Sequence, residues 1–319
     1  MRALLAFAVT LVTGLALMPA LIGQLARRHA GQRLSAWTPA THLEKAGTPT
    51  MGGLLFVVLA VAAWAVLDHS RLGLSIAFAI LAGGAIGALD DVNNIRGRLA
   101  LGLLGRQKLV LQLLVGVLVG VGLHAAGATS QLVPLFGTHD LDWAIVPIAA
   151  LAVVAASNAV NLTDGVDGLA GSCSLVAFAA LWLLSAHTGA RPAAVLSAAT
   201  CGGVLAFLAY NWWPARVFMG DTGSLALGSG LAAASAAAGV LWLLPLLGLV
   251  FVAETLSVII NVTAIRRFKR RIFRASPLHH HFEALGLRER RLVVSFAGVG
   301  ALAAGLTLLL GWRSAPGAR

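Results

Sequence analysis

Aspartates stand at the ends of long apolar stretches in this chain. Asp90 and Asp91 follow one such stretch, Asp164 and Asp167 follow another, and Asp221 precedes a third. A carboxylate beside a bilayer is costly, so an acid in this position indicates a function by default. Carboxylates that gather together also repel one another unless a cation joins them. The pattern predicts a polar, cation-binding site built at a membrane surface.

The segment Asn158–Gly171 has the most specific spacing. Polar side chains recur at every third position, as Asn158, Asn161, Asp164 and Asp167. If the segment were helical throughout, this spacing would align them along one slowly rotating face. A structural loop rarely needs amides and carboxylates in such an arrangement near lipid, so the pattern favours a ligand site over a plain turn.

Three further polar segments adjoin apolar stretches. They are Lys45–Gly53, which contains Lys45 and Thr50; Asn211–Ser224, which contains Asn211, Phe218, Gly220 and Asp221; and Pro277–Glu283, which contains His279, His280 and His281. Each has a structural alternative: a helix start beside packing glycines, an N-cap for Asp221, and a structural histidine cluster. Consecutive histidines without helical i, i+4 spacing are weak evidence for a transition metal, and contacts with phosphate oxygens suit them better.

The aspartate pair predicts a partner of its own. Acids at the C-terminus of a helix oppose the helix macrodipole, so we expect a compensating cation near Asp90 and Asp91. Adjacent helical residues point about 100 degrees apart, so these carboxylates should have different roles. A hard, oxygen-lined site that also handles phosphates suits magnesium.

The composition places these residues in a membrane. The chain has 319 residues, of which 59% are hydrophobic and only 11% charged, too apolar for a soluble domain of this length. A spanning helix needs roughly 20 apolar residues, because hydrocarbon cannot satisfy backbone polar groups. The candidate spans are 3–23, 50–67, 72–89, 108–127, 143–160, 169–187, 192–211, 222–239, 241–264 and 292–312.

The predicted fold is therefore an all-α, polytopic integral membrane protein with about ten transmembrane helices. We expect a single transmembrane catalytic domain over residues 1–319. The longest polar interruption, residues 265–291, is a basic loop that carries the histidine cluster. It is too short to bury a core of its own.

The cations predict the orientation. With the spans above, the 23 Lys and Arg residues fall on one side of the membrane except for Arg2, Arg71, Arg191, Arg313 and Arg319. The positive-inside rule makes the cation-rich side cytoplasmic, which puts both termini outside. The aspartates fall on the cytoplasmic side as well. The active site should therefore face the cytosol.

The net charge of +11 does not require a nucleic-acid partner. Topology and anionic membrane lipid explain the basic run Arg266–Arg271 more simply. A transporter or channel for an anionic metabolite is a rival hypothesis, since acids in broken helices also mark transport pathways. Transport sites lie near the bilayer midplane, and only Glu254 is well inside a span, which weighs against transport.

At these residues the chain resembles the polyprenyl-phosphate hexose-1-phosphate transferase superfamily. The resemblance covers nearly the whole chain and is carried by Gly47–Gly53, Leu89–Asp91, Gly105–Lys108, Asn158–Gly171, Phe218–Gly228 and Pro277–Glu283. The three-histidine segment is similar to the phospho-N-acetylmuramoyl-pentapeptide transferase family. The alternative within the superfamily is a polyprenyl-phosphate N-acetylglucosamine-1-phosphate transferase.

The resemblance implies a reaction and its partners. Undecaprenyl phosphate would attack the β-phosphate of UDP-N-acetylmuramoyl-pentapeptide in the presence of Mg²⁺, giving lipid I and UMP. The enzyme would be a multi-pass protein of the bacterial inner membrane and would act in peptidoglycan synthesis. A homodimer is compatible with the sequence, which does not determine the oligomeric state.

The resemblance also implies site residues, position by position. Asp221 would be the metal ligand, and Asp90 and Asp91 would be the acidic pair near the lipid phosphate. The uridine would be held by Asn161, Asp164, Phe218 and Gly220. The diphosphate and sugar would be lined by Lys45, Thr50, Lys108, Asn158 and Asn211, with His279, His280 and His281 beside them as part of the catalytic set.

The ionisation of a phosphate monoester bears on whether Asp90 must act as a base. A phosphate monoester has a second pKa of roughly 6, so most of the lipid nucleophile is already a dianion near neutral pH. We therefore expect Asp90 to orient the lipid phosphate more than to remove a proton from it. Behind the aspartate pair, Val92, Asn93 and Asn94 stand where many family members have an aromatic residue and a lysine. A phosphate contact is then either missing there or supplied by Arg96 or Arg98.

Overall fold

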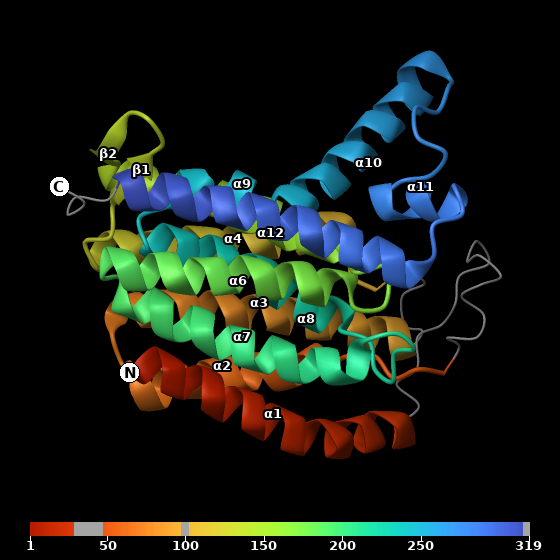
Figure 1. Cartoon of the computed structure of the whole chain (residues 1–319), viewed down its shortest axis with the longest axis horizontal. Helices are drawn as coiled ribbons and strands as arrows, with labels where there is room; N and C mark the ends of the chain where they lie inside the picture. The colour runs from red at the N-terminus through yellow and green to blue at the C-terminus, as the bar shows by residue number, and fades with distance from the viewer. Residues whose placement is uncertain (29–46, 97–101, 315–319) are drawn as a thin grey trace.

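The computed structural model describes residues 1–28, 47–96 and 102–314, and Figure 1 shows them as a bundle of long helices. The long helices are α1 (Arg2–Arg27), α2 (Gly53–Leu67), α3 (Arg71–Arg96), α4 (Gly105–Ala125), α5 (Ile145–Thr163), α6 (Leu169–Thr188), α7 (Arg191–Asn211), α8 (Gly220–Ala237), α10 (Leu249–Phe268) and α12 (Glu289–Ser314). Every predicted span overlaps one of them, and the span predicted over 241–264 overlaps α10 only in part. The prediction of a polytopic, all-α membrane protein is confirmed.

Within the described residues, 8 helices are long and apolar enough to cross a bilayer. The exceptions among the predicted spans are α2 and α8. Helix α2 is apolar but has only 15 residues. Helix α8 has 18 residues, rich in glycine, alanine and serine. Eight of the about ten predicted spans therefore meet these criteria, and α2 and α8 could cross a bilayer only where other helices separate them from lipid.

The surroundings of α8 explain its low hydrophobicity. Every residue from Thr222 to Ala237 is buried, and the helix is contacted by α2, α3, α4, α5, α6 and α7. A helix enclosed by protein needs small residues that allow close packing, and it needs no apolar face for lipid. Helix α8 is therefore the central element of the bundle.

Glycines bring the central helices into backbone contact. A Cβ atom added to Gly87 of α3 would lie only 2.0 Å from the carbonyl oxygen of Asp221 in α8. Gly83, one turn earlier, would meet Ser229 and Leu225 of α8 in the same way. Small residues four positions apart commonly allow such close approach between membrane helices. The ends of α3 and α8 that carry the acids are thus joined at the level of the backbone.

The structure differs from the predicted elements at three places. The span predicted over 241–264 is interrupted: a 3-10 turn η3 (Leu241–Leu243) and the short α9 (Leu244–Leu247) precede α10, which begins after Gly248. The basic loop contains a helix, α11 (Leu278–Ala284). A hairpin of β1 (Ser130–Val133) and β2 (Gly137–Asp140) precedes the 3-10 turn η2 (Asp142–Ala144).

The bundle has two distinct ends. Figure 1 shows the start of α1, the end of α12 and the β1–β2 hairpin at the left, which we call the hairpin end. At the opposite end α10 leans away from the other helices and α11 lies beside it. This cation-rich end also carries the basic residues from Arg266 to Arg274. That the cation-rich end faces the cytoplasm stays a prediction of the positive-inside rule.

Candidate active site

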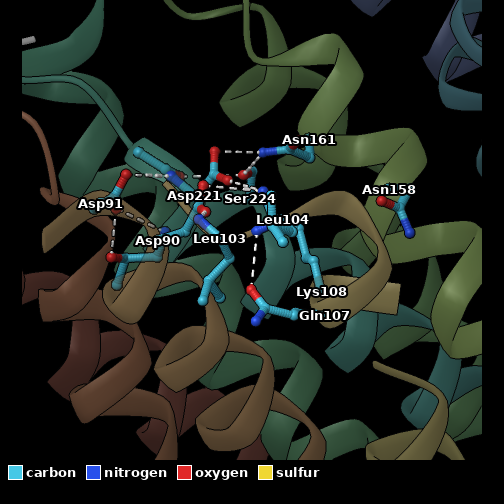
Figure 2. A network of polar contacts seen from close by, with 12 residues as sticks. Asp90, Asp91, Leu103, Leu104, Gln107, Lys108, Asn158, Asn161, Asp221 and Ser224 are labelled. Atoms are coloured by element: carbon cyan, nitrogen blue, oxygen red, sulfur yellow. Dashed lines mark hydrogen bonds and ion pairs between the residues drawn. The ribbon is translucent and has the colours of Figure 1, made fainter. Parts of the chain in front are cut away.

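Three helices bring Asp90, Lys108 and Asp221 together at the cation-rich end. The Lys108 Nζ lies 3.0 Å from Asp90 Oδ2 and 2.6 Å from Asp221 Oδ2. The other oxygen of Asp90 accepts the main-chain N–H of Leu103 at 2.5 Å. The compensating cation expected near Asp90 is therefore Lys108, donated by the first turn of α4. Figure 2 shows these side chains pointing toward one another.

Asp91 has a different partner, as the angle between adjacent helical residues predicts. Its Oδ1 accepts the main-chain N–H of Asp221 at 3.1 Å, and its Oδ2 accepts the N–H and hydroxyl of Thr222 at 2.9 and 2.6 Å. A carboxylate at a helix N-terminus satisfies free N–H groups and faces the positive end of the macrodipole. Asp91, which is buried, thus caps α8 from α3.

Asp221 is held from a further side by α5. The Asn161 amide donates to Asp221 Oδ1 at 2.7 Å and to Ser224 Oγ at 2.9 Å. The alternative that Asp221 is only an N-cap is wrong, because Met219 is the capping position and makes no side-chain cap bond. Asp221 lies in the first turn, and its carboxylate is directed toward Lys108 and Asn161. Its side chain retains 24% exposure, so the carboxylate remains reachable.

The segment before α2 lies against the start of α8. The Phe218 N–H donates to the Pro49 carbonyl at 2.8 Å, and the Gly52 N–H donates to the Phe218 carbonyl at 2.9 Å. Gly220 has φ of +72°, and a Cβ there would lie 2.8 Å from the Thr50 hydroxyl. Thr50, Phe218 and Gly220 are therefore brought together next to the acids. Lys45 and Arg98 lie outside the described residues, as does the side chain of Arg96.

The continuous helical face expected over 158–167 is not formed. Helix α5 ends at Thr163, and the chain turns before α6. Asn158 donates to Gln112 and to the Val154 carbonyl, and Figure 2 shows it apart from the acids. Asp167 accepts the N–H of Ala215, so its carboxylate fixes a loop. The reason is local: glycines in the turn release the chain from the helix that the spacing assumed.

Asn211 is also engaged in structure. Its side-chain oxygen accepts the N–H of Gly168 at 3.0 Å, and its amide donates to the Val217 carbonyl at 2.8 Å. The side chain is buried and ties the α5–α6 turn to the segment before α8. The structure thus places Asn158 and Asn211 outside the Asp90–Lys108–Asp221 network.

Asp164 lies at the C-terminal cap of α5, outside the spanning segment. Burial, followed by the negative charges of Asp221, Asp91 and Asp167, raises the pKa of Asp164 to about 8. The side chain keeps some contact with solvent. A carboxyl group whose pKa is raised in this way marks a place where positive charge is in short supply. An added cation would favour its ionised form.

The histidines of α11 have different polar partners, although the rings of His279 and His280 contact one another with their centroids 4.2 Å apart. His279 is buried, with Nδ1 3.2 Å from Glu254 Oε1. The Nδ1 of His280 lies 2.6 Å from Glu283 Oε2, and the Nδ1 of His281 accepts the N–H of Arg274 at 3.1 Å. Each ring is therefore held by a different partner.

The carboxylates at this site are suited to a divalent cation. Oxygens of Asp90 and Asp221 converge on one ammonium group, which shows that both carboxylates can share a positive charge. Mg²⁺ in phosphoryl-transfer sites is usually held by one or two carboxylates, with phosphate oxygens and water completing the shell. Among the described residues no group of three His, Cys, Asp or Glu side chains could hold a metal, and such a cage is not needed here. The donor set fits magnesium.

The sequence analysis gave no site role to four contributors, which are Thr222, Ser224, Glu254 and the Leu103 N–H. Thr222 and Ser224 bind the acids and amides of the site, and their place in the first turn of α8 was the available signal. Glu254 contacts His279, and its signal was a single acid inside an apolar span. The Leu103 N–H carried no signal, because any non-proline residue supplies one.

Comparisons with known proteins give matches over nearly the whole chain. Residues 73–239 match the glycosyl transferase family 4, and residues 45–57 match the phospho-N-acetylmuramoyl-pentapeptide-transferase signature 1. The chain is 44% identical over 312 residues to the phospho-N-acetylmuramoyl-pentapeptide-transferase of Moorella thermoacetica, covering 96% of each chain. It is 40% identical to that of Geobacillus thermodenitrificans, covering 96% of this chain and 97% of the relative. With that of Desulforudis audaxviator it shares 42% identity over 95% of each chain.

Proposed function

Because the chain belongs to the phospho-N-acetylmuramoyl-pentapeptide-transferase family, we propose that it transfers phospho-N-acetylmuramoyl-pentapeptide from UDP to undecaprenyl phosphate. The products are lipid I and UMP. The observation that carries the proposal is the pairing of Asp90 and Asp221 through Lys108 at the cation-rich helix ends. This site lies where a lipid phosphate and a water-soluble nucleotide sugar can meet.

The reaction forms one P–O bond and breaks another. An oxygen of the lipid phosphate attacks the β-phosphorus of the UDP-linked precursor. The bond between that phosphorus and the bridging oxygen breaks, and UMP leaves with the electron pair. Mg²⁺ held by Asp221, with Asp90 beside it, would neutralise the charge that develops on the departing UMP. Lys108 supplies a further positive charge between the two carboxylates.

Asp90 is a positioning group in this proposal. One of its oxygens accepts the Leu103 N–H and the other binds Lys108, so the carboxylate already has partners for both oxygens. A group that holds Lys108 in place can orient the lipid phosphate without taking up a proton. Asp90→Asn should therefore lose activity to a similar extent at pH 6 and at pH 9. Recovery at pH 9, where the phosphate is fully ionised, would instead favour a general base.

The nucleotide contacts complete the proposal. Phe218, Gly220 and Asp164 surround the Asp221 end of the site and would contact the uridine, with the Phe218 ring available for stacking. Asn161 already binds Asp221, so it would act on the nucleotide through that carboxylate. His279 of α11 lies against the turn at Gly165, and we expect His280 and His281 to contribute beside it. The site is expected to face the cytoplasm, and a homodimer stays a prediction.

Release of UMP tests the function directly. Purified protein with Mg²⁺, undecaprenyl phosphate and UDP-N-acetylmuramoyl-pentapeptide should release UMP, whereas UDP-N-acetylglucosamine should not serve. Asp221→Asn should lower the rate on the order of 1,000-fold, because the carboxylate acts at the point where charge develops. Asp142→Asn is the matched control, since that aspartate lies at the hairpin end with a side chain 71% exposed. Turnover of UDP-N-acetylglucosamine alone would indicate the other branch, and no UMP from either sugar would favour a transporter.

A further inference from the structure

Helix α10 carries a buried polar stripe on an otherwise lipid-exposed surface. Glu254, Ser257 and Asn261 are buried, whereas Leu256 and Ile259 are exposed. Residues 254, 257 and 261 are spaced by three and four positions, so they lie along one face of the helix. Polar groups on this face of a membrane helix require partners in the protein.

The partners come from the segment that follows α10. The side-chain oxygen of Asn261 accepts the N–H groups of Ile272 and Phe273 at 3.1 and 3.3 Å, and its amide donates to the Ser276 hydroxyl at 3.2 Å. The carboxylate of Glu254 accepts the main-chain N–H of His279 at 3.2 and 3.3 Å. The stripe therefore binds the chain back onto α10 and fixes the start of α11.

Glu254 also holds the His279 ring. The side chains are 0% and 1% exposed, and Glu254 Oε1 lies 3.2 Å from Nδ1. Among the ion pairs between described residues, Glu254 takes part only in this one. The negative charge of a buried carboxylate beside Nδ1 favours the proton on that nitrogen, which leaves Nε2 as the nitrogen available to a ligand.

The direction of Nε2 points to the nucleotide side of the site. A Cβ added to Gly165 would lie 2.4 Å from Nε2, so the ring rests against the turn that begins at Asp164. Neither ring nitrogen of His279 has a hydrogen-bond partner among the described residues, although both are buried: Nδ1 faces Glu254 Oε1 at 3.2 Å without hydrogen-bond geometry, and Nε2 faces the turn. A buried polar nitrogen without a partner is costly, and a polar group of a bound substrate would satisfy it.

We infer that Glu254 is a positioning residue that fixes His279 so that Nε2 meets a polar group of the nucleotide-sugar substrate beside the Asp164 turn. The inference rests on the proposed function for the identity of that substrate. Glu254 does not touch the substrate, and it acts through His279. The first test is on the unaltered protein: ¹⁵N spectra of its histidine rings, assigned to His279 by comparison with His279→Gln, should show the proton on Nδ1.

Kinetics separate positioning from a general structural role. Glu254→Gln should lower kcat/KM for the UDP-linked donor by about 10- to 100-fold, the loss of one or two hydrogen bonds to a charged group. The KM for undecaprenyl phosphate should change by less than about twofold, and Glu254→Asp should recover part of the activity. Ser257→Ala, one turn away on the same buried face, is the matched control and should keep the unaltered rate.

A double-mutant cycle with His279→Ala decides the outcome. If Glu254 acts through His279, the double variant should be no slower than His279→Ala alone. Additive losses, or a proton on Nε2 in the unaltered protein, would overturn the inference. Absence of UMP release by the unaltered enzyme would refute the proposed function instead, so the two failures can be told apart.

Discussion

Both ends of α8 are held by a side chain from a distant part of the sequence, but only one of these clamps is charged. At the cation-rich end, the Asp91 carboxylate accepts the N–H groups of Asp221 and Thr222. At the hairpin end, the Gln131 amide donates to the Ala236 carbonyl at 2.9 Å and its oxygen accepts the Leu241 N–H at 3.1 Å. Asp91 and Gln131 are both buried.

The difference shows what each end is for. A neutral amide satisfies buried backbone groups without the desolvation cost that a buried charge carries. At the hairpin end the neutral Gln131 amide makes these contacts at a lower desolvation cost, and they contribute to stability. The cation-rich end has a carboxylate where the macrodipole favours one, and the residue it positions is Asp221. The buried charge of Asp91 occurs at the end of α8 where it positions Asp221, a proposed reacting group.

Removing the charged clamp should have the largest effect of the comparison. Asp91→Asn keeps the shape but turns an amide toward N–H groups that need an acceptor, so α8 should lose its ordered first turn. Activity should fall at least about 100-fold, and hydrogen exchange at the Asp221 and Thr222 amides should quicken. Asp90→Asn is the matched control and should leave that exchange slow. Unchanged exchange in an inactive Asp91→Asn enzyme would mean that Asp91 contacts substrate.

Removing the Lys108 ammonium should have an effect on activity between those of the Asp91 and Gln131 changes. Lys108→Met removes the ammonium shared by Asp90 and Asp221, so the rate should fall roughly 10-fold. The same change should lower the Mg²⁺ concentration that gives half of the maximal rate, because the carboxylates lose a competing positive charge. A magnesium titration of both enzymes measures this. An unchanged requirement would show that the ammonium and the metal do not share these carboxylates.

Removing the neutral clamp should have the smallest effect on catalysis. Gln131→Ala leaves the Ala236 carbonyl and the Leu241 N–H without their partner, which should lower the Tm by about 3–6 °C. The rate of UMP release below that temperature should stay within about twofold of the unaltered enzyme. A loss of activity as large as that of Asp91→Asn would erase the distinction between the two ends.

Much of the fold could be predicted from the sequence, because a bilayer imposes a length and composition on every element that crosses it. Each predicted span contains a long helix, and the cation expected near Asp90 is present as Lys108. The break at Gly248 was not predicted, because α9 and η3 are as apolar as the span that they interrupt. Helix α11 was not predicted, because a short polar helix shows little hydrophobic periodicity.

The sequence predicted which residues form the site, but it did not predict which of them contact one another. The acids, the amides and the lysine were identified, and most of them meet. The division of labour between Asp90 and Asp91 was expected, but the cap on α8 joins residues 130 positions apart. No local pattern encodes such a contact. Spacing grouped Asp167 with the residues of α5 on the assumption of a helix beyond Thr163, but the chain turns there. Asn158 and Asn211, which the family resemblance suggested, are bonded to Gln112 and to the segment before α8 instead of to the acids.

The glycine contact between α3 and α8 has a consequence for how substrates enter. Where main chains touch, as at Gly87 and Asp221, no side chain remains that could change rotamer and widen the gap. The contact between α3 and α8 beside the acids is therefore rigid. The segment after α10 is held differently: α10 leans away from the other helices in Figure 1, and side-chain hydrogen bonds from Asn261 and Glu254, not touching main chains, hold the histidine segment, so a movement that admits a bulky glycopeptide is expected there.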